Sequence, residues 1–153
     1  MMREMHRIIE LDEARCRQLL ATHPNRLGRV AFVEDGDPDW PTVLPINYAF
    51  VDGTVFFRTF EGSKLYAALR RQRVAFEVDT VDADWKQGWS VVALGSLELV
   101  TDAEQRAAVG DVLTSWAADD TKHLVRLDIE QMTGREILGR SSSGDGAPPP
   151  RAD

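Results

Sequence analysis

The chain has 153 residues, 43% of them hydrophobic and 28% charged, which fits one ordinary globular domain with a buried core. No apolar run approaches the roughly 20 residues of a membrane-spanning helix, and a net charge of −7 argues against general nucleic-acid binding. The amino terminus is too charged for a secretory signal, and a single cysteine allows no internal disulfide, so we expect a cytoplasmic protein.

The first predicted elements are a short helix, a strand and a loop. Leu11 to Ala21 is typical of a helix capped by Asp12, with Cys16 near its buried side. No histidine is suggested as a partner for this thiol, so we expect it to pack in the core rather than act as a nucleophile. Arg29 to Val33 follows as a strand, and the turn-forming residues Gly36 to Pro41 follow as a loop.

The centre of the chain predicts a β-hairpin. Thr42 to Val51 and Thr54 to Arg58 are rich in β-branched and aromatic residues, and Asp52-Gly53 between them is typical of a two-residue turn with positive φ at both positions. Alternation along the first strand places its large apolar side chains on the face that should fill the core: Leu44, Ile46, Tyr48 and Phe50. The thinner face carries Val43, Pro45, Asn47, Ala49 and Val51.

Two features of this region point to a ligand. Asn47 can meet a ligand ring or, alternatively, bond a nearby backbone group. Lys64 opens a predicted helix, where a cation is unfavourable unless an anion lies nearby, and Ser63 suits either a helix cap or a phosphate. From residue 58 to residue 73 five basic residues accompany one acid, a net charge of +4: Arg58, Lys64, Arg70, Arg71 and Arg73 with Glu61. This island suits a small anionic ligand, and the alternative is a solvated basic helix face.

The second half of the chain predicts further strands. Arg73 to Thr80 is one strand, and Trp89 to Thr101 is a longer one that Gly95 interrupts with a bend or bulge. A capping-box pattern from Thr101 to Glu104 predicts a helix start. The apolar stripe of that helix is Val109, Val112, Leu113 and Trp116. Two more strands are predicted, Lys122 to Ile129 and Thr133 to Leu138.

The order of the elements predicts a small barrel. Many strands with two to three short helices, and no alternating βα units, indicate a mainly β fold that closes on itself. We assign residues 1–138 to this domain. Residues 139–153, rich in Ser, Gly and Pro, are predicted to be a disordered tail.

Several common sites are missing from the sequence. It contains no dinucleotide-binding glycine motif, no P-loop and no nucleophile elbow. The three histidines lack the spacing of metal ligands, so no metal site is predicted: His6, His23 and His123. No residue stands out as a catalytic acid, base or nucleophile.

Several motifs, in one order, resemble a known family. They are PINYAF, FFRTFEGSKL, VAFEVD and GWSVVALGSLELVTD, and the match runs from about Leu19 to about Ile137. The chain resembles the pyridoxamine 5′-phosphate oxidase-like FMN-binding split-barrel family, and more narrowly its small bacterial flavin or deazaflavin oxidoreductase branch, which includes nitroimidazole-resistance-type proteins. The resemblance implies a split β-barrel of six or so antiparallel strands with Greek-key-like connections. It also implies a homodimer with FMN at its interface.

The resemblance implies which residues hold the flavin. Four flank the ring: Pro45, Ile46, Asn47 and Tyr48. Five hold the phosphate side: Arg58, Thr59, Ser63, Lys64 and Leu65. Trp89 and Ser90 approach from a strand, which can belong to the second subunit. Trp40 and Trp85 lie in loops, where either can cover the pocket or meet a partner.

The activity implied is that of an oxidoreductase, in which flavin N5 exchanges a hydride with a small organic substrate. The C-terminal arginine and tryptophan motif of the oxidase proper is absent, so we do not expect oxidation of vitamin B6. A non-catalytic flavin-binding module is the alternative of a different class. Some relatives use the deazaflavin F420, which needs a longer basic groove, and others bind haem, which needs an exposed axial ligand. Arg70, Arg71 and Arg73 are the candidates for the groove.

Overall fold

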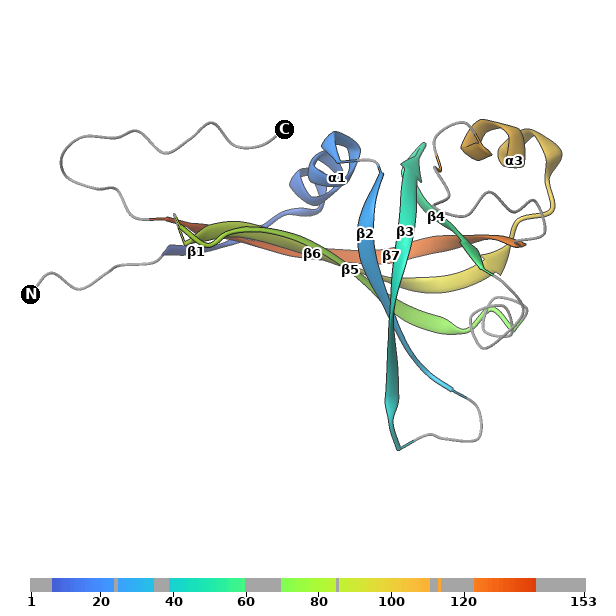
Figure 1. Cartoon of the computed structure of the whole chain (residues 1–153), viewed down its shortest axis with the longest axis horizontal. Coiled ribbons are helices and arrows are strands. Elements are labelled where there is room, and N and C mark those ends of the chain that lie inside the picture. Colours follow the sequence, from blue (N-terminus) through green and yellow to red (C-terminus); the bar gives the residue numbers. More distant parts are fainter. Residues whose placement is uncertain are drawn as a thin grey trace, which may run out of the picture.

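The computed structural model describes residues 7–23, 25–34, 39–59, 70–84, 86–110, 113 and 123–139. In these residues one antiparallel sheet of seven strands is accompanied by two helices (Figure 1). The strands are β1 (Arg7–Leu11), β2 (Asn25–Val33), β3 (Pro41–Val51), β4 (Thr54–Thr59), β5 (Arg73–Asp82), β6 (Gln87–Leu99) and β7 (His123–Leu138). The helices are α1 (Glu13–Thr22) and α3 (Ala103–Gly110). None of the described helices has the length and apolarity to cross a membrane.

The sheet closes into a ring. The strand order is β1-β7-β4-β3-β2-β5-β6, and a further pairing of β6 with β7 joins the ends. Six strands therefore form a closed barrel, and β1 adds to the edge of β7 beyond the point where β4 ends. Figure 1 shows β2 and β3 running crosswise to β5, β6 and β7. This architecture confirms the predicted mainly β split barrel.

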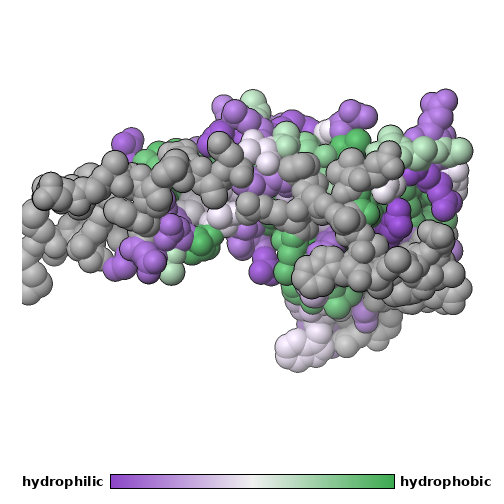
Figure 2. Space-filling model, turned by 45° about the horizontal axis from the view of Figure 1, so that its top comes forward, coloured by the Kyte–Doolittle hydropathy of each residue, from purple (hydrophilic) through white to green (hydrophobic). Residues whose placement is uncertain are grey.

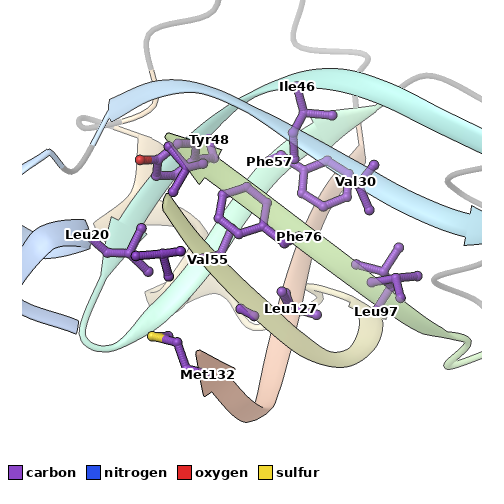
Figure 3. Packing of buried hydrophobic residues seen from close by; sticks show 14 of the residues in the cluster. Leu20, Val30, Ile46, Tyr48, Val55, Phe57, Phe76, Leu97, Leu127 and Met132 are labelled. Atoms are coloured by element: carbon purple, nitrogen blue, oxygen red, sulfur yellow. The ribbon is translucent and has the colours of Figure 1, made fainter. Parts of the chain in front are cut away.

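The barrel interior is the main core. Alternate side chains of every barrel strand point inward, and Figure 3 labels examples from each of these strands together with Leu20 of α1. Tyr48 and Phe76 meet edge to face at its centre, with ring centroids 5.0 Å apart. Helix α1 adds Cys16 and Leu20, both fully buried. The predicted inward face of the hairpin strand is thus confirmed.

The predicted helix near the amino terminus forms and is tied to the hairpin. Asp12 caps it by accepting a hydrogen bond from the backbone N–H of Arg15 at 2.8 Å, although the helix runs over Glu13–Thr22. The side chain of Arg17 donates to the carbonyl of Gly53 at 3.3 Å. At the hairpin turn Asp52 and Gly53 have φ of 50° and 78°, as the two-residue turn requires.

A second, smaller core lies under α3. Val109 and Leu113 pack with the outward-facing Ala49 and Phe56 of the hairpin. The predicted capping box is wrong by one residue, because α3 begins at Ala103 and the carboxylate that accepts the N–H of Glu104 at 3.2 Å belongs to Asp102 rather than Thr101. Val112 and Trp116, predicted on the same stripe, lie outside the described residues.

One long strand, β7, replaces the two that were predicted for residues 122–138. The ladder with β6 passes from Gly95↔Ile129 to Leu94↔Gln131, so Glu130 is an extra residue and β7 bulges there. Inward positions on β7 accordingly change from odd numbers to even numbers. The predicted irregularity at Gly95 is confirmed, while the division into two strands is wrong because the bulge interrupts the alternation but not the strand.

The first two strands also differ from the prediction. Strand β1 had no counterpart in the prediction, because its largely exposed residues show no clean alternation. Strand β2 begins at Asn25 rather than Arg29, and Gly28 lets it continue, since a Cβ there would lie 2.5 Å from the ring of Phe76. The predicted tail, residues 139–153, lies outside the described residues except for its first residue, Gly139. Trp85 also lies outside them, whereas Trp40 is described and is 72% exposed.

Candidate functional site

The four predicted ring-flanking residues on β3 divide between two faces. Ile46 and Tyr48 point into the barrel, and the Tyr48 hydroxyl donates to the carbonyl of His23 at 3.0 Å. Pro45 is exposed and Asn47 is half-buried on the outer face, which we define as the side of the sheet pointing away from the barrel interior. Side chains that can meet a ligand on the outer face are therefore those of Pro45 and Asn47, with backbone groups from the strand between them.

Near this pair of residues, β3 is hydrogen-bonded to a neighbouring strand on one side only. Strand β2 pairs with β3 along its full length from Pro41 to Ala49, but β4 pairs with it only from Tyr48 to Val51. Among the described strands, the edge of β3 from Pro41 to Asn47 thus has no ladder partner on the β4 side. Backbone N–H and C=O groups at such an edge are available to bond a ligand.

Arg58 on β4 reaches the same face. Phe57 pairs with Tyr48 and points inward, so the next residue, Arg58, points outward like Asn47 beside Tyr48. Its guanidinium lies near the end of α3, because a Cβ on Gly110 would be 3.9 Å from Arg58 Nη2. A structural role for Arg58 at the carbonyl end of α3 is the competing interpretation. Thr59, the next residue, is buried and is only 4% exposed.

The rest of the predicted phosphate set cannot be placed. Ser63, Lys64 and Leu65 lie outside the described residues. Two of the other basic residues of the island contact surface acids: Arg71 lies 3.7 Å from Glu98, and Arg73 lies 3.1 Å from Glu130. The island therefore contains at least two arginines engaged with carboxylates of the same chain.

Trp89 and Ser90 are neighbours in sequence but lie on opposite faces of β6. Trp89 packs against the barrel core and stacks on His23, with ring centroids 5.4 Å apart and an interplanar angle of 26°. Ser90 faces outward. The structure therefore does not bring the two side chains to one place.

Ser90 is also distant from Asn47 around the barrel. In the six-stranded ring β6 lies three strands from β3 in both directions. At about 4.8 Å between neighbouring strands, the path is roughly 14 Å over a convex surface. A single flavin ring on one chain cannot contact Asn47 and Ser90 together, so the two residues meet one ligand only if they come from different chains.

Sequence reasoning missed a hollow beside Ser90. It has a volume of about 440 Å3 and is formed where β1, β6 and β7 run side by side. Its lining residues are Glu10, Leu11, Ser90, Val92, Thr133, Gly134 and Arg135. The residues come from three segments far apart in sequence, and only the strand pairing brings them together.

On the outer face, between Asn47 and the hollow beside Ser90, a cluster of charged side chains lies next to apolar ones. Arg29 Nη1 lies 3.1 Å from a carboxylate oxygen of Glu77 and 3.5 Å from one of Asp79. Burial raises the pKa of Glu77, and Asp79 raises it further, although Arg29 acts in the opposite direction. One row across four strands holds Val43, Ala31, Ala75 and Leu94, of which Val43 is 58% and Leu94 is 42% exposed. Figure 2 shows hydrophobic residues at the surface between hydrophilic ones on the side that it displays.

The fold is a split β-barrel of six strands, with β1 added at the edge of β7. The profile of the pyridoxamine 5′-phosphate oxidase family matches residues 12–136, and the chain belongs to that family. The uncharacterized protein Rv0080 of Mycobacterium tuberculosis is 33% identical over 139 residues, which are 88% of this chain and 88% of that protein.

Many solved structures are similar, and two of them are representative. The FAD binding protein from Mycobacterium smegmatis is 34% identical with a TM-score of 0.68, and the match covers 84% of this chain and 98% of that one. A 5-nitroimidazole antibiotic resistance protein from Bacteroides thetaiotaomicron has a TM-score of 0.68 over 88% of this chain and 90% of that one. At 15% identity the second likeness shows the fold alone.

Proposed function

We propose that the protein is a flavin-dependent oxidoreductase that exchanges a hydride with a small organic substrate. The observation that carries this proposal is the outward pair Asn47 and Arg58 beside the single-sided edge of β3, in a chain of the pyridoxamine 5′-phosphate oxidase family. The similar protein named for FAD supports a flavin as the ligand. The isoalloxazine supplies the redox chemistry through its N5 atom.

The residues of this chain bind and orient the cofactor. The guanidinium of Arg58 forms charge-assisted hydrogen bonds to a phosphate, and its expected partners are Ser63 and Lys64, where the sequence predicts a helix start. The amide of Asn47 bonds a polar edge of the ring, and exposed Pro45 offers an apolar contact. No acid or base is assigned, because hydride exchange needs mainly position and polarisation.

FMN is the cofactor expected from the sequence, and this part of the site serves FMN and FAD equally. Both carry the same ring and the same first phosphate. The position of Asn47 and Arg58 therefore supports a flavin without choosing between them.

We further propose that the enzyme works as a homodimer. Ser90 lies too far from Asn47 to share its ligand within one chain, and a two-fold dimer brings each Ser90 to the other subunit's flavin. The exposed apolar residues of the outer face, which include Leu27 at 54% exposure and Val43 at 58%, suit burial against a second copy. Sedimentation velocity of the wild type and of Val43→Arg tests this: the variant should shift towards a monomer and lose flavin, and an unchanged dimer would contradict the arrangement.

The alternative cofactors receive less support. Haem needs an exposed axial ligand, and in the described part of the chain Cys16, His23 and Met132 are each no more than 5% exposed, which leaves the half-buried His123 at the start of β7 as the candidate there. F420 needs a basic groove, but Arg71 and Arg73 already contact Glu98 and Glu130. The absorbance spectrum of the purified protein separates the three, since flavin gives paired bands, haem an intense Soret band and deazaflavin one band near the violet.

The phosphate assignment is tested by Arg58→Ala combined with Lys64→Ala. Two charge-assisted bonds contribute about 1.5–3 kcal/mol each, so the dissociation constant for FMN should rise about a hundredfold or more. Arg106→Ala, which removes one positive charge from the exposed side of α3, is the surface-charge control and should leave the affinity unchanged. Equal affinity of the folded double variant and the control would refute the assignment.

Turnover distinguishes the enzyme from a non-catalytic flavin module. The loaded wild type is mixed anaerobically with a nicotinamide donor, and flavin absorbance is followed in stopped flow with candidate acceptors. Bleaching of the flavin followed by reoxidation with an organic acceptor supports the oxidoreductase. A bound flavin that no donor reduces would favour the module.

A further inference from the structure

The hollow beside Ser90 has a defined polar pattern. Glu10 pairs with Arg135, and Arg135 pairs with Ser90, so the three residues form one row across β1, β7 and β6. Thr133 and Val92 form the adjacent row on the same side. The row thus presents a carboxylate, a guanidinium and a hydroxyl side by side, with a second hydroxyl and an apolar side chain next to them.

We propose that this hollow binds an adenosine 5′-phosphate group. Its volume of about 440 Å3 falls in the range of about 300–1,000 Å3 that is usual for small-ligand sites. The guanidinium of Arg135 bonds the phosphate, and the carboxylate of Glu10 accepts hydrogen bonds from the ribose hydroxyls, as acidic residues do in other nucleotide sites. Val92 supplies apolar surface for the base, and the hydroxyls of Ser90 and Thr133 bond its polar edge or the ribose.

The charges favour this ligand over simpler anions. A free phosphate dianion would meet one guanidinium and, a single strand away, the carboxylate of Glu10, so attraction and repulsion largely cancel. A ligand with a phosphate at one end and a diol near it satisfies both groups.

The place of the hollow connects it to the flavin, and this step rests on the proposed function and its dimer. An adenosine 5′-phosphate group forms half of FAD and half of the nicotinamide donors. With Ser90 turned towards the other subunit's flavin, the hollow lies where the adenylate half of FAD, or of an incoming nicotinamide dinucleotide, can be held. The shared chemistry is the adenylate, and the choice of source is left to experiment.

The test uses the full-length protein and AMP itself, followed by isothermal titration calorimetry. AMP should bind to the wild type with a dissociation constant of about 1 mM or lower, and Arg135→Gln should weaken it about tenfold. Adenosine lacks the phosphate, so its affinity should not respond to that variant. Glu10→Gln should weaken AMP but not 2′,3′-dideoxy-AMP. Arg7→Ala, on the same strand as Glu10 but outside the hollow, is the control and should change nothing.

The outcomes separate the two proposals. Absence of saturable AMP binding, or equal AMP affinity in Arg135→Gln and Arg7→Ala, overturns the adenylate site even if flavin binds. AMP binding that responds to Arg135→Gln in a protein that binds no flavin supports the hollow and refutes the proposed function. If FAD binds more tightly than FMN and the difference disappears in Arg135→Gln, the adenylate belongs to FAD. If Arg135→Gln weakens only the binding of NADH or NADPH, the adenylate belongs to the nicotinamide donor.

Discussion

Replacement of Gly95 by alanine tests the strand crossing that closes the barrel. A Cβ at this position would overlap the carbonyl oxygen of Asp128, and it would lie 2.9 Å from the carbonyl carbon of Asp128 and 3.1 Å from Cα of Ile129. These are backbone atoms of β7, so no side chain can rotate away. The β6–β7 ladder must open at the bulge, with loss of about two hydrogen bonds and of packing around them.

We expect Gly95→Ala to lower the free energy of unfolding by about 3 kcal/mol or more. For a chain of this size that corresponds to a fall in melting temperature of roughly 6–12 °C. Urea unfolding followed by tryptophan fluorescence measures the change. Gly53→Ala is the control, because at φ +78° with Arg17 Nη1 3.4 Å away its strain is local and should reduce stability by about 1 kcal/mol. If Gly95→Ala unfolds within 1 kcal/mol of the wild type, the crossing is looser than the reasoning requires.

Two further predictions concern the buried contacts of α1. Tyr48→Phe removes the hydroxyl that donates to the His23 carbonyl at 3.0 Å and should lower the unfolding free energy by about 1–2 kcal/mol in the same urea assay; no measurable change would mean that the bond contributes nothing. Burial, and then the charges of Asp12 and Glu13, raise the pKa of the Cys16 thiol, so its contribution to stability is complete below the unfolded-state pKa and is lost as the pH rises through the folded-state pKa. Native protein should therefore react with Ellman's reagent far more slowly than protein in guanidinium, and Cys16→Ala should flatten the alkaline loss of stability; rapid labelling of native protein would contradict this.

Local signals were enough to predict the hairpin and the helix cap of α1. Asp52 and Gly53 adopt the positive φ angles that the hairpin turn requires, and the side chain of Asp12 caps α1. Neither feature depends on distant residues. By contrast, β7 was predicted as two strands because its pattern of alternation changes at Glu130. That change arises from pairing with Gly95, a contact between residues 34 or more positions apart, which a reading of neighbouring residues does not detect.

In the candidate site, too, local patterns were predicted correctly and contacts between distant residues were missed. Alternation correctly separated Asn47 from Ile46 and Tyr48, but the set of ring-flanking residues combined both faces of β3. Likewise, Trp89 and Ser90 were grouped as sequence neighbours although successive strand residues point to opposite sides. The hollow was missed because Glu10, Ser90 and Arg135 meet only through the pairing of β7 with both β1 and β6. A search for polar residues at alternate positions on the long strands would have found Thr133 and Arg135, but not their neighbours.

Strand β7 bonds with β1, β4 and β6, and it follows all of them along the chain. During synthesis the barrel can therefore close only after residues 123–138, which form β7, have left the ribosome. Until then β4 and β6 each expose a row of unsatisfied backbone groups, which are the places where a stalled or slowly made chain is prone to pair with another copy. Folding of this protein should accordingly be late and all-or-none, with little protection of the earlier strands in a nascent chain.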